Sequence, residues 1–198
     1  MSKGAPSVRY AEIERESPGM RSSVVLDFDG GTHRDVSTGS PILDFWLRQF
    51  AYYGQFNLGL QVTSDRPMHC HQLCVEVGLA LGHAIRECLE DSRDIRRMAS
   101  THAVVEDALM LVAIDLGGRS HFSWDVNPGR ETIAEISSQS ARELFAALCD
   151  EGRMALHVRQ ESGVNANNVL ESVFRGLGRS LHVAAELVDR SGGNGSRR

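Results

Sequence analysis

Side chains that bind metals or act in catalysis are concentrated in one short stretch of this chain. Cys70 and Cys74 are four residues apart, a spacing that places both on one face of a helix, and His69 and His71 lie beside Cys70. Thiolates and imidazoles are ligands for soft metal ions. Cysteines inside cytosolic proteins, however, usually behave as small hydrophobic residues. We favour this second role, and we predict no disulfide framework from four cysteines in 198 residues.

The composition is that of an ordinary globular protein. Hydrophobic residues make up 41% of the chain and charged residues 24%, and its length suits one substantial core or two small units that share one. The formal net charge of −5 argues against a general nucleic-acid-binding surface. No apolar run approaches the roughly 20 residues of a membrane helix, and no signal peptide is evident. We therefore expect a cytoplasmic protein without nucleic-acid or membrane partners.

The elements that would position reactive side chains occur twice. A strand-like run that reaches Gly30-Gly31 is echoed by one that reaches Gly117-Gly118, and apolar residues alternate before both glycine pairs. A short return strand is expected after each pair. Near the end of each copy, Leu81-Gly82 matches Leu177-Gly178 within a long amphipathic helix. The chain therefore contains an internal duplication.

A shorter helix and a strand lie between these features in both copies. The first helix is expected to begin near Pro41 and the second to cover about 141–150. Gly54 and Gly152 are expected to end them in the left-handed conformation common after helices. A strand of alternating polar and apolar residues follows each glycine, and the second strand carries His157 on its polar face.

The duplication predicts an α+β fold made of two tandem ββαβα-like half-domains, with sheets on one side and helices on the other. We expect disorder at both ends of the chain, because the tail is rich in Gly and Ser. The predicted divisions are a disordered N-terminus at 1–7, a first half-domain at 8–93, a second half-domain at 94–188 and a disordered tail at 189–198.

Six short segments form a specific pattern through their order and separations. They are Arg9-Tyr10-Ala11-Glu12, Asp35-Val36-Ser37-Thr38-Gly39, Gly54-Gln55-Phe56-Asn57-Leu58, Asp94-Ile95-Arg96-Arg97, Asp115-Leu116-Gly117-Gly118-Arg119 and Leu156-His157-Val158. Over roughly residues 8 to 188 this pattern resembles the imidazoleglycerol-phosphate dehydratase family of histidine biosynthesis. The resemblance implies a lyase that binds two manganese ions between subunits, in trimers that gather into a larger cage.

The resemblance also implies a His-His-x-x-Glu metal-binding motif at the start of each long helix, and the first copy departs from it. His71 is present, but Gln72 occupies the second histidine position and Val75 the glutamate position. Glu76 does not replace the lost ligand, because one residue along a helix is a rotation of about 100°. The resemblance places Gly19 at the position of a further glutamate of the family.

The second copy of the motif is changed as well. Asn167 and Asn168 occupy both histidine positions, while Glu171 remains. Phe45 occupies a further ligand position on the first helix, and His157 matches the family's isolated histidine ligand. Neutral amides are poor ligands for first-row transition metals, and a phenyl ring is none. We therefore predict a degenerate metal site without a bound metal cofactor.

Three of the implied ligands survive, namely His71, His157 and Glu171. We predict that these residues act as general acid and base if the protein is an enzyme. The alternative is that they bind one manganese ion weakly. A histidine on its own is more often a hydrogen-bonded structural residue, so the two histidines have a structural interpretation too.

The basic residues that the resemblance directs at a substrate phosphate are better preserved. Arg97 and Arg119 match the family, and Arg175 stands where the family has a lysine, so its charge is kept. Guanidinium groups bind phosphate oxygens in a bidentate manner, which predicts an anionic or phosphorylated small molecule as ligand. The alternative is that these arginines form salt bridges or subunit contacts.

Three functions remain open from the sequence. The first is a divergent enzyme that acts on a phosphorylated or imidazole-like compound by acid–base chemistry. The second is a catalytically silent homologue that binds a ligand or a partner. The third is a genuine imidazoleglycerol-phosphate dehydratase with replaced ligands. In each case the resemblance implies a homo-oligomer, which we expect to be a trimer that forms the larger cage weakly or not at all.

Overall fold

Two four-stranded sheets and four helices form the fold in the part of the chain that a computed structural model describes, residues 9–67, 69–90, 94–129 and 132–188. This confirms the predicted α+β class. The disorder predicted for 1–7 and 189–198 lies outside the described residues. None of the described helices is long and apolar enough to cross a membrane.

Each half begins with one strand more than the predicted ββαβα order. The first half contains β1 (Tyr10–Ser17), β2 (Met20–Asp27), β3 (Arg34–Ser37), α1 (Pro41–Gly54), β4 (Asn57–Ser64) and α2 (Cys70–Leu89). The second half contains β5 (Met98–Val105), β6 (Ala108–Asp115), β7 (His121–Asp125), α3 (Ser138–Gly152), β10 (Ala155–Ser162) and α4 (Ala166–Ala184), with a small hairpin of β8 (Thr132–Ile133) and β9 (Ile136–Ser137) before α3. The additional strands, β1 and β5, pair with the strands that reach the glycine pairs.

The sheets have matching strand orders, β1-β2-β4-β3 and β5-β6-β10-β7. The return strands β3 and β7 do not pair with the strands that precede them, because β4 and β10 are inserted between the two. Both return strands run parallel to the inserted strand, whereas β2 and β6 run antiparallel to it. The residues just after each short helix therefore lie in the middle of a sheet.

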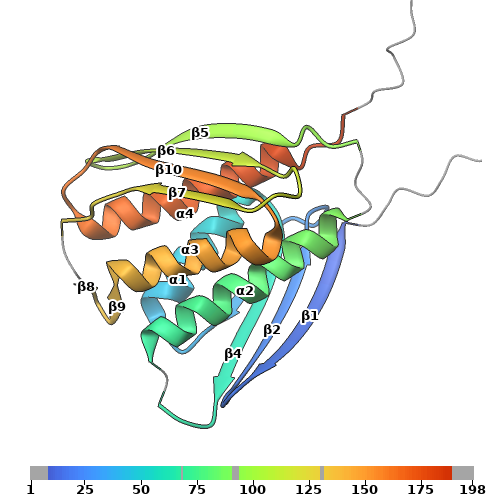
Figure 1. The fold of residues 1–198 in the computed structure, drawn as a ribbon, viewed down its shortest axis with the longest axis vertical. Helices are drawn as coiled ribbons and strands as arrows, with labels where there is room; N and C mark the ends of the chain where they lie inside the picture. Colours follow the sequence, from blue (N-terminus) through green and yellow to red (C-terminus); the bar gives the residue numbers. More distant parts are fainter. Residues whose placement is uncertain (1–8, 68, 91–93, 130–131, 189–198) are drawn as a thin grey trace, which may run out of the picture.

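The helices lie between the two sheets (Figure 1). Within each half the sheet is on one side and the helices are on the other, and the helical layers of the two halves face each other. The long helix of each half packs against the short helix of the other half, α2 on α3 and α1 on α4. Trp46 of α1 stacks on Phe174 of α4 with ring centroids 5.6 Å apart, so both halves share one core.

The matched glycines Gly82 and Gly178 lie where these helices cross. A Cβ on Gly178 would be 2.1 Å from the carbonyl oxygen of Phe50, and a Cβ on Gly82 would be 2.6 Å from the carbonyl oxygen of Leu148. Atoms cannot approach this closely, so a residue without a side chain is required at both positions. The internal repeat therefore serves the packing of one half on the other.

The prediction for the ends of the short helices was wrong by one residue. Helix α1 begins at Pro41 as expected, but Gln55 and Arg153 take the left-handed conformation after α1 and α3, with φ of 55° and 48°. Gly54 and Gly152 are still helical. Gly54 lacks a side chain for a different reason, because a Cβ there would lie 1.9 Å from the ring of Phe56.

Candidate functional site

The start of α4 contains Asn167 and Asn168, the two asparagines that the family resemblance places at the histidine positions of the second motif. The side chain of Asn165 caps this helix, accepting hydrogen bonds from the backbone N–H groups of Asn167 at 3.0 Å and Asn168 at 3.3 Å. The Asn167 side-chain oxygen accepts a hydrogen bond from the Trp46 indole N–H at 3.2 Å. Asn167 therefore connects α4 to α1 of the other half.

Asn168 is buried and holds the turn between β5 and β6. Its side-chain N–H₂ group donates to Glu106 at 3.0 Å and to Asp107 at 2.8 Å. Asp107 also accepts from the backbone N–H groups of Val164 at 2.7 Å and Asn165 at 3.1 Å. Sequence reasoning missed Glu106 and Asp107, although an acidic pair between two strands is a recognisable turn signal. An amide donor fits this pair of carboxylates, so Asn168 has a structural role.

These bonds predict a dependence of stability on acid. The hydrogen bond from Val164, followed by those from Asn168 and Asn165, lowers the pKa of Asp107 to about 2. The carboxylate therefore adds stability that is present above its unfolded pKa of about 3.9 and is lost as the pH falls towards 2. We expect Asp107→Asn to unfold at lower urea than the wild type at pH 7, and the difference to shrink between pH 4 and pH 2. Asp125→Asn is the control, and a difference that stays constant with pH would contradict this account.

The retained Glu171 and Arg175 bind each other. They are four residues apart on α4, and an Arg175 Nη2 donates to the Glu171 carboxylate, which is 5% exposed. The Arg175 guanidinium also lies over the ring of Tyr53, with its Cζ 4.9 Å from the ring centroid. The Nε of Arg175 is buried and has no hydrogen-bond partner within the described ranges. The charge of Arg175 is thus neutralised by Glu171, the residue predicted above to act in catalysis.

Arg97 and Arg119 lie close to the second glycine pair, since the Arg97 guanidinium lies beside Gly117 and Arg119 directly follows Gly118 in the chain. Arg97 forms two hydrogen bonds with Asp115, at 2.8 and 3.3 Å, and this contact raises the pKa of Arg97. The Arg97 backbone is left-handed, with φ of 75°, and its N–H donates to the Ala184 carbonyl at 2.7 Å. Arg119 is exposed and forms no ion pair with any described residue. Of the three arginines, Arg119 is the one available to a ligand without breaking an ion pair.

The two surviving histidines are exposed and come from different layers. His71 lies in the first turn of α2, whereas His157 lies on the outer face of the second sheet, with its ring centroid 5.1 Å from that of His121. Glu171 lies in the helical layer. Among the described residues, no group of three or more His, Cys, Asp or Glu side chains is arranged to hold a metal ion. His71, His157 and Glu171 are therefore not brought together within one copy of the chain. A weak manganese site formed by these residues from different copies stays a prediction.

Cys74 and Glu76 of α2 have structural roles. Cys74 is fully buried, and burial raises its pKa to about 12, which agrees with the hydrophobic role predicted for it. Glu76 is also buried; its carboxylate accepts from Ser22 at 2.6 Å and pairs with Arg15 at 3.4 Å. Glu76 therefore faces the first sheet and does not stand in for Val75.

The side chains at the positions of the implied manganese ligands have an unsuitable chemistry. Val75 and Phe45 contain no donor atom. Gln72 is a neutral amide, and the amides of Asn167 and Asn168 are engaged in the hydrogen bonds described above. These five side chains do not fit a centre of two manganese ions, which needs imidazole and carboxylate donors.

Comparison with known proteins agrees with the resemblance found in the sequence. A family model described as imidazoleglycerol-phosphate dehydratase matches residues 38–181. A protein of that name from Caldicellulosiruptor saccharolyticus is 32% identical over 183 residues, which cover 92% of this chain and 94% of that protein. Another from Cereibacter sphaeroides is 35% identical over 179 residues, covering 90% and 92%.

Two solved structures are similar as well. The dehydratase structure from Pyrococcus furiosus matches with a TM-score of 0.78 and 28% identity, over 90% of this chain and 96% of that one. The structure of the enzyme from Staphylococcus aureus matches with a TM-score of 0.80 over 90% and 99%. Its sequence is 18% identical, so this second match concerns the fold alone.

Proposed function

Because the chain belongs to the imidazoleglycerol-phosphate dehydratase family, we propose that it is a divergent member that acts on a phosphorylated or imidazole-like small molecule without two manganese ions. The observation that carries this proposal is the role of the second motif. Both residues in the histidine positions, Asn167 and Asn168, are engaged in hydrogen bonds that hold α4 to α1 and to the β5–β6 turn.

In this proposal arginines recognise the anionic end of the ligand. Arg119 is exposed, and Arg97 lies beside the same glycine pair with a guanidinium that is about half exposed. Arg175 would contribute once Glu171 releases it, since its partly buried charge is balanced by that carboxylate. Charge-assisted bidentate hydrogen bonds are roughly twice as strong as hydrogen bonds between neutral groups, so affinity for an anion does not require a metal.

His71, His157 and Glu171 are the residues proposed for proton transfer. The imidazoles of His71 and His157 are accessible at the surface, whereas Glu171 would act only after separating from Arg175. Because the two histidines are exposed on different layers, they would meet a common ligand only between copies of the chain. We therefore include in the proposal a homo-oligomer, a trimer, whose cage form is weakened or absent.

A catalytically silent ligand-binding protein is the second candidate. The Glu171–Arg175 ion pair favours it, because it neutralises a residue proposed for catalysis and one proposed for phosphate binding. A genuine dehydratase with replaced ligands is the third candidate, and the names of relatives that are 32–35% identical favour it.

Calorimetric titration of metal-free protein with imidazoleglycerol phosphate separates these functions. We expect binding in the presence of EDTA, and we expect Arg119→Gln to weaken it roughly tenfold, the loss typical of one charge-assisted contact. Arg159→Gln is the matched control, because Arg159 is an exposed arginine that pairs with Glu161 on the second sheet.

Product analysis completes this experiment. Conversion in EDTA supports the divergent enzyme, and binding without conversion supports the silent homologue. Absence of binding in EDTA, together with conversion on addition of manganese, would overturn the proposal in favour of the genuine dehydratase.

A further inference from the structure

The second sheet ends in a strand whose free edge lacks the protection found at the other sheet edges. β5 pairs with β6 on one side and has no described strand on the other, and it runs along the rim of the molecule in Figure 1. It is eight residues long, pairs with β6 without a register shift, and contains no proline, lysine, arginine, aspartate or glutamate. An uninterrupted and uncharged edge strand is a template on which another strand can pair.

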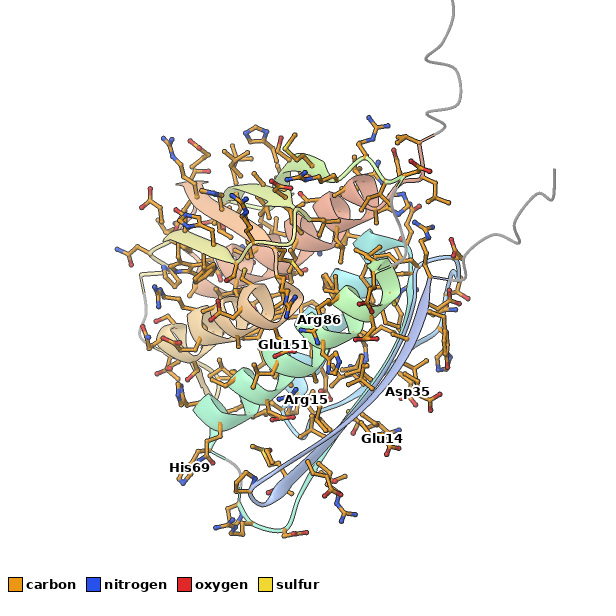
Figure 2. All side chains as sticks on the ribbon, turned by 45° about the vertical axis from the view of Figure 1, so that its right-hand side comes forward. Glu14, Arg15, Asp35, His69, Arg86 and Glu151 are labelled. Atoms are coloured by element: carbon orange, nitrogen blue, oxygen red, sulfur yellow. The ribbon has the colours of Figure 1, made fainter. Side chains whose placement is uncertain are left out.

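The other edge strands of the two four-stranded sheets differ from β5 in ways that discourage pairing. β3 and β7 have only four and five residues. β1, which has the same place in the first sheet as β5 in the second, carries Glu12, Glu14, Arg15 and Glu16. Figure 2 shows Glu14 on the side of β1 that faces away from the helices. Short length and charge are common means by which proteins block pairing at a sheet edge, so the edge of β5 is the open one among these four.

The alternation along β5 decides which of its backbone groups are free. The two-residue turn between Val105 and Ala108 makes these residues a hydrogen-bonded pair. At the other end of the strand, the N–H of Leu116 donates to the Arg97 carbonyl at 3.0 Å. The odd-numbered residues of β5 therefore bond to β6. The N–H and C=O groups that point away from β6, towards the open edge, are those of the even-numbered residues Met98, Ser100, His102 and Val104.

The helix beneath β5 leaves this edge accessible. α4 packs against β5 from the helical side, yet Ala99 and Thr101, whose side chains point to that side, are half-exposed. On the outer side, Met98 and Val104 are each 62% exposed. Apolar side chains at both ends of the open edge are stabilised by burial against a partner.

The sequence of β5 has the same character when it is read in either direction from Thr101. Each direction gives a polar residue, an alanine and an exposed apolar residue, namely Ser100, Ala99 and Met98 one way and His102, Ala103 and Val104 the other. A two-fold axis at Thr101 sets two copies antiparallel, with polar residues opposite polar ones and apolar residues opposite apolar ones. In this register every even-numbered residue of one strand is opposite an even-numbered residue of the other, so all their free N–H and C=O groups find partners.

We propose that the edge of β5 binds a second copy of this chain, which adds its own β5 in antiparallel orientation and joins the two four-stranded sheets into one continuous sheet. Main-chain hydrogen bonds supply the affinity, and contact of Met98 with Val104 of the second copy buries apolar surface. Because β5 contains no carboxylate, lysine or arginine, its own side chains bring no like charges of this kind together. A two-fold contact is separate from the trimer of the proposed function, and it uses none of the residues proposed there for the ligand or for proton transfer.

Thr101→Cys tests the register of this pairing. In a non-hydrogen-bonded antiparallel pair the two Cα atoms are about 4.5 Å apart, which a disulfide can bridge. We expect mild oxidation of the full-length variant in EDTA to give a disulfide-linked dimer, with the bond located at position 101 by peptide mapping. The wild type is treated in parallel, because Cys70 is partly exposed.

Ser100→Cys and His102→Cys are the matched controls for this cross-link. Each of these residues would lie diagonally from its own counterpart, about 7 to 8 Å away, which is too far for a disulfide. We expect both variants to cross-link at least roughly tenfold more slowly than Thr101→Cys. Equal or faster cross-linking in either control would overturn the two-fold pairing at Thr101.

Ser100→Pro tests the hydrogen bonds of the edge. It removes one N–H that points away from β6, so the bonds between β5 and β6 are kept. The readout is hydrogen exchange of the His102 amide, which has no described partner within one copy. In the wild type we expect this exchange to slow at least roughly tenfold between dilute and concentrated protein, and in Ser100→Pro we expect no such dependence. Glu14→Pro is the matched control, because the Glu14 N–H likewise points away from β2 at the edge of β1.

Two results would overturn the inference from this second experiment. The first is fast exchange of the His102 amide at every protein concentration. The second is slow exchange at every concentration without a cross-link in Thr101→Cys, because the edge would then be covered by part of its own chain. Slow exchange at every concentration together with that cross-link supports the inference. Neither experiment uses a ligand or manganese, so failure here leaves the proposed function standing.

Discussion

Purified protein is expected to contain far less than one manganese ion per chain, and addition of manganese to metal-free protein should leave its mass in light scattering unchanged. The reason is that Val75 and Phe45 have no atom that could coordinate a metal ion. The side-chain amide of Asn168 is already hydrogen-bonded to Glu106 and Asp107. If the ions bridged subunits, as the resemblance implies, their loss would remove the metal-dependent contact between trimers. The dehydratase from Caldicellulosiruptor saccharolyticus, purified in parallel, is the comparison protein.

A gain of function tests the same argument in the opposite direction. Gln72 is exposed and Val75 is half-buried, so Gln72→His with Val75→Glu rebuilds the first motif without disturbing the core. We expect this double variant to bind manganese at least roughly tenfold more tightly than the wild type, because imidazole and carboxylate replace a neutral amide and an alkyl group. Stoichiometric manganese in the wild type, or a manganese-dependent rise in its mass, would refute the degenerate site.

Gly178→Ala should cause a large loss of stability, because the added methyl group meets a backbone carbonyl of the facing helix. The new Cβ would lie 2.1 Å from the Phe50 carbonyl oxygen and 3.0 Å from the Gly54 backbone nitrogen, so α1 and α4 must separate. Separation also pulls Trp46 away from Phe174. We expect a loss of about 3 kcal/mol in the free energy of unfolding and a fall in Tm on the order of 10 °C for a chain of this size.

Gly31→Ala is the matched control for this substitution. Apart from its two chain neighbours, no described residue has a heavy atom within 4 Å of a Cβ built on Gly31, so the free energy of unfolding should change by less than about 0.5 kcal/mol. Urea denaturation of the two variants beside the wild type gives the comparison. Equal effects of the two alanines would show that backbone entropy, and not the helix crossing, governs the response at Gly178.

The positions of the predicted metal ligands on the long helices show which features a local sequence pattern can predict and which it cannot. The sequence is sufficient to predict that Asn167, Asn168 and Val75 stand where the family has metal ligands, because that prediction depends on neighbours along the chain. It is not sufficient to say what the asparagines do instead. Asn168 bonds Glu106 and Asp107, about sixty residues away, and such partners become neighbours only when β5 and β6 pack beside α4.

The arginines illustrate the same limit on the functional side. Their charge and family positions were readable from the sequence, and the predicted preference for phosphate followed from them. Only the folded chain decides that Arg175 is balanced by Glu171, that Arg97 is held by Asp115, and that Arg119 has no ion-pair partner among the described residues. The one-turn spacing of Glu171 and Arg175 was visible in the sequence, and it was the signal that could have predicted their pairing.

The sequence alone determined the duplicated α+β architecture and led to the prediction of degenerate metal motifs. Alternating strands, amphipathic helices and repeated glycines are properties of residues close along the chain, so their pattern predicts most of the elements, with β1, β5 and the β8–β9 hairpin as the exceptions. The tertiary structure decided how the elements combine, with β4 and β10 inserted between earlier strands and each long helix on the short helix of the other half. It also placed the Arg66 guanidinium against Gly19, a contact across more than forty residues that no local pattern encodes. Burial of one common core selects these arrangements, because only the folded chain brings distant apolar surfaces and charges together.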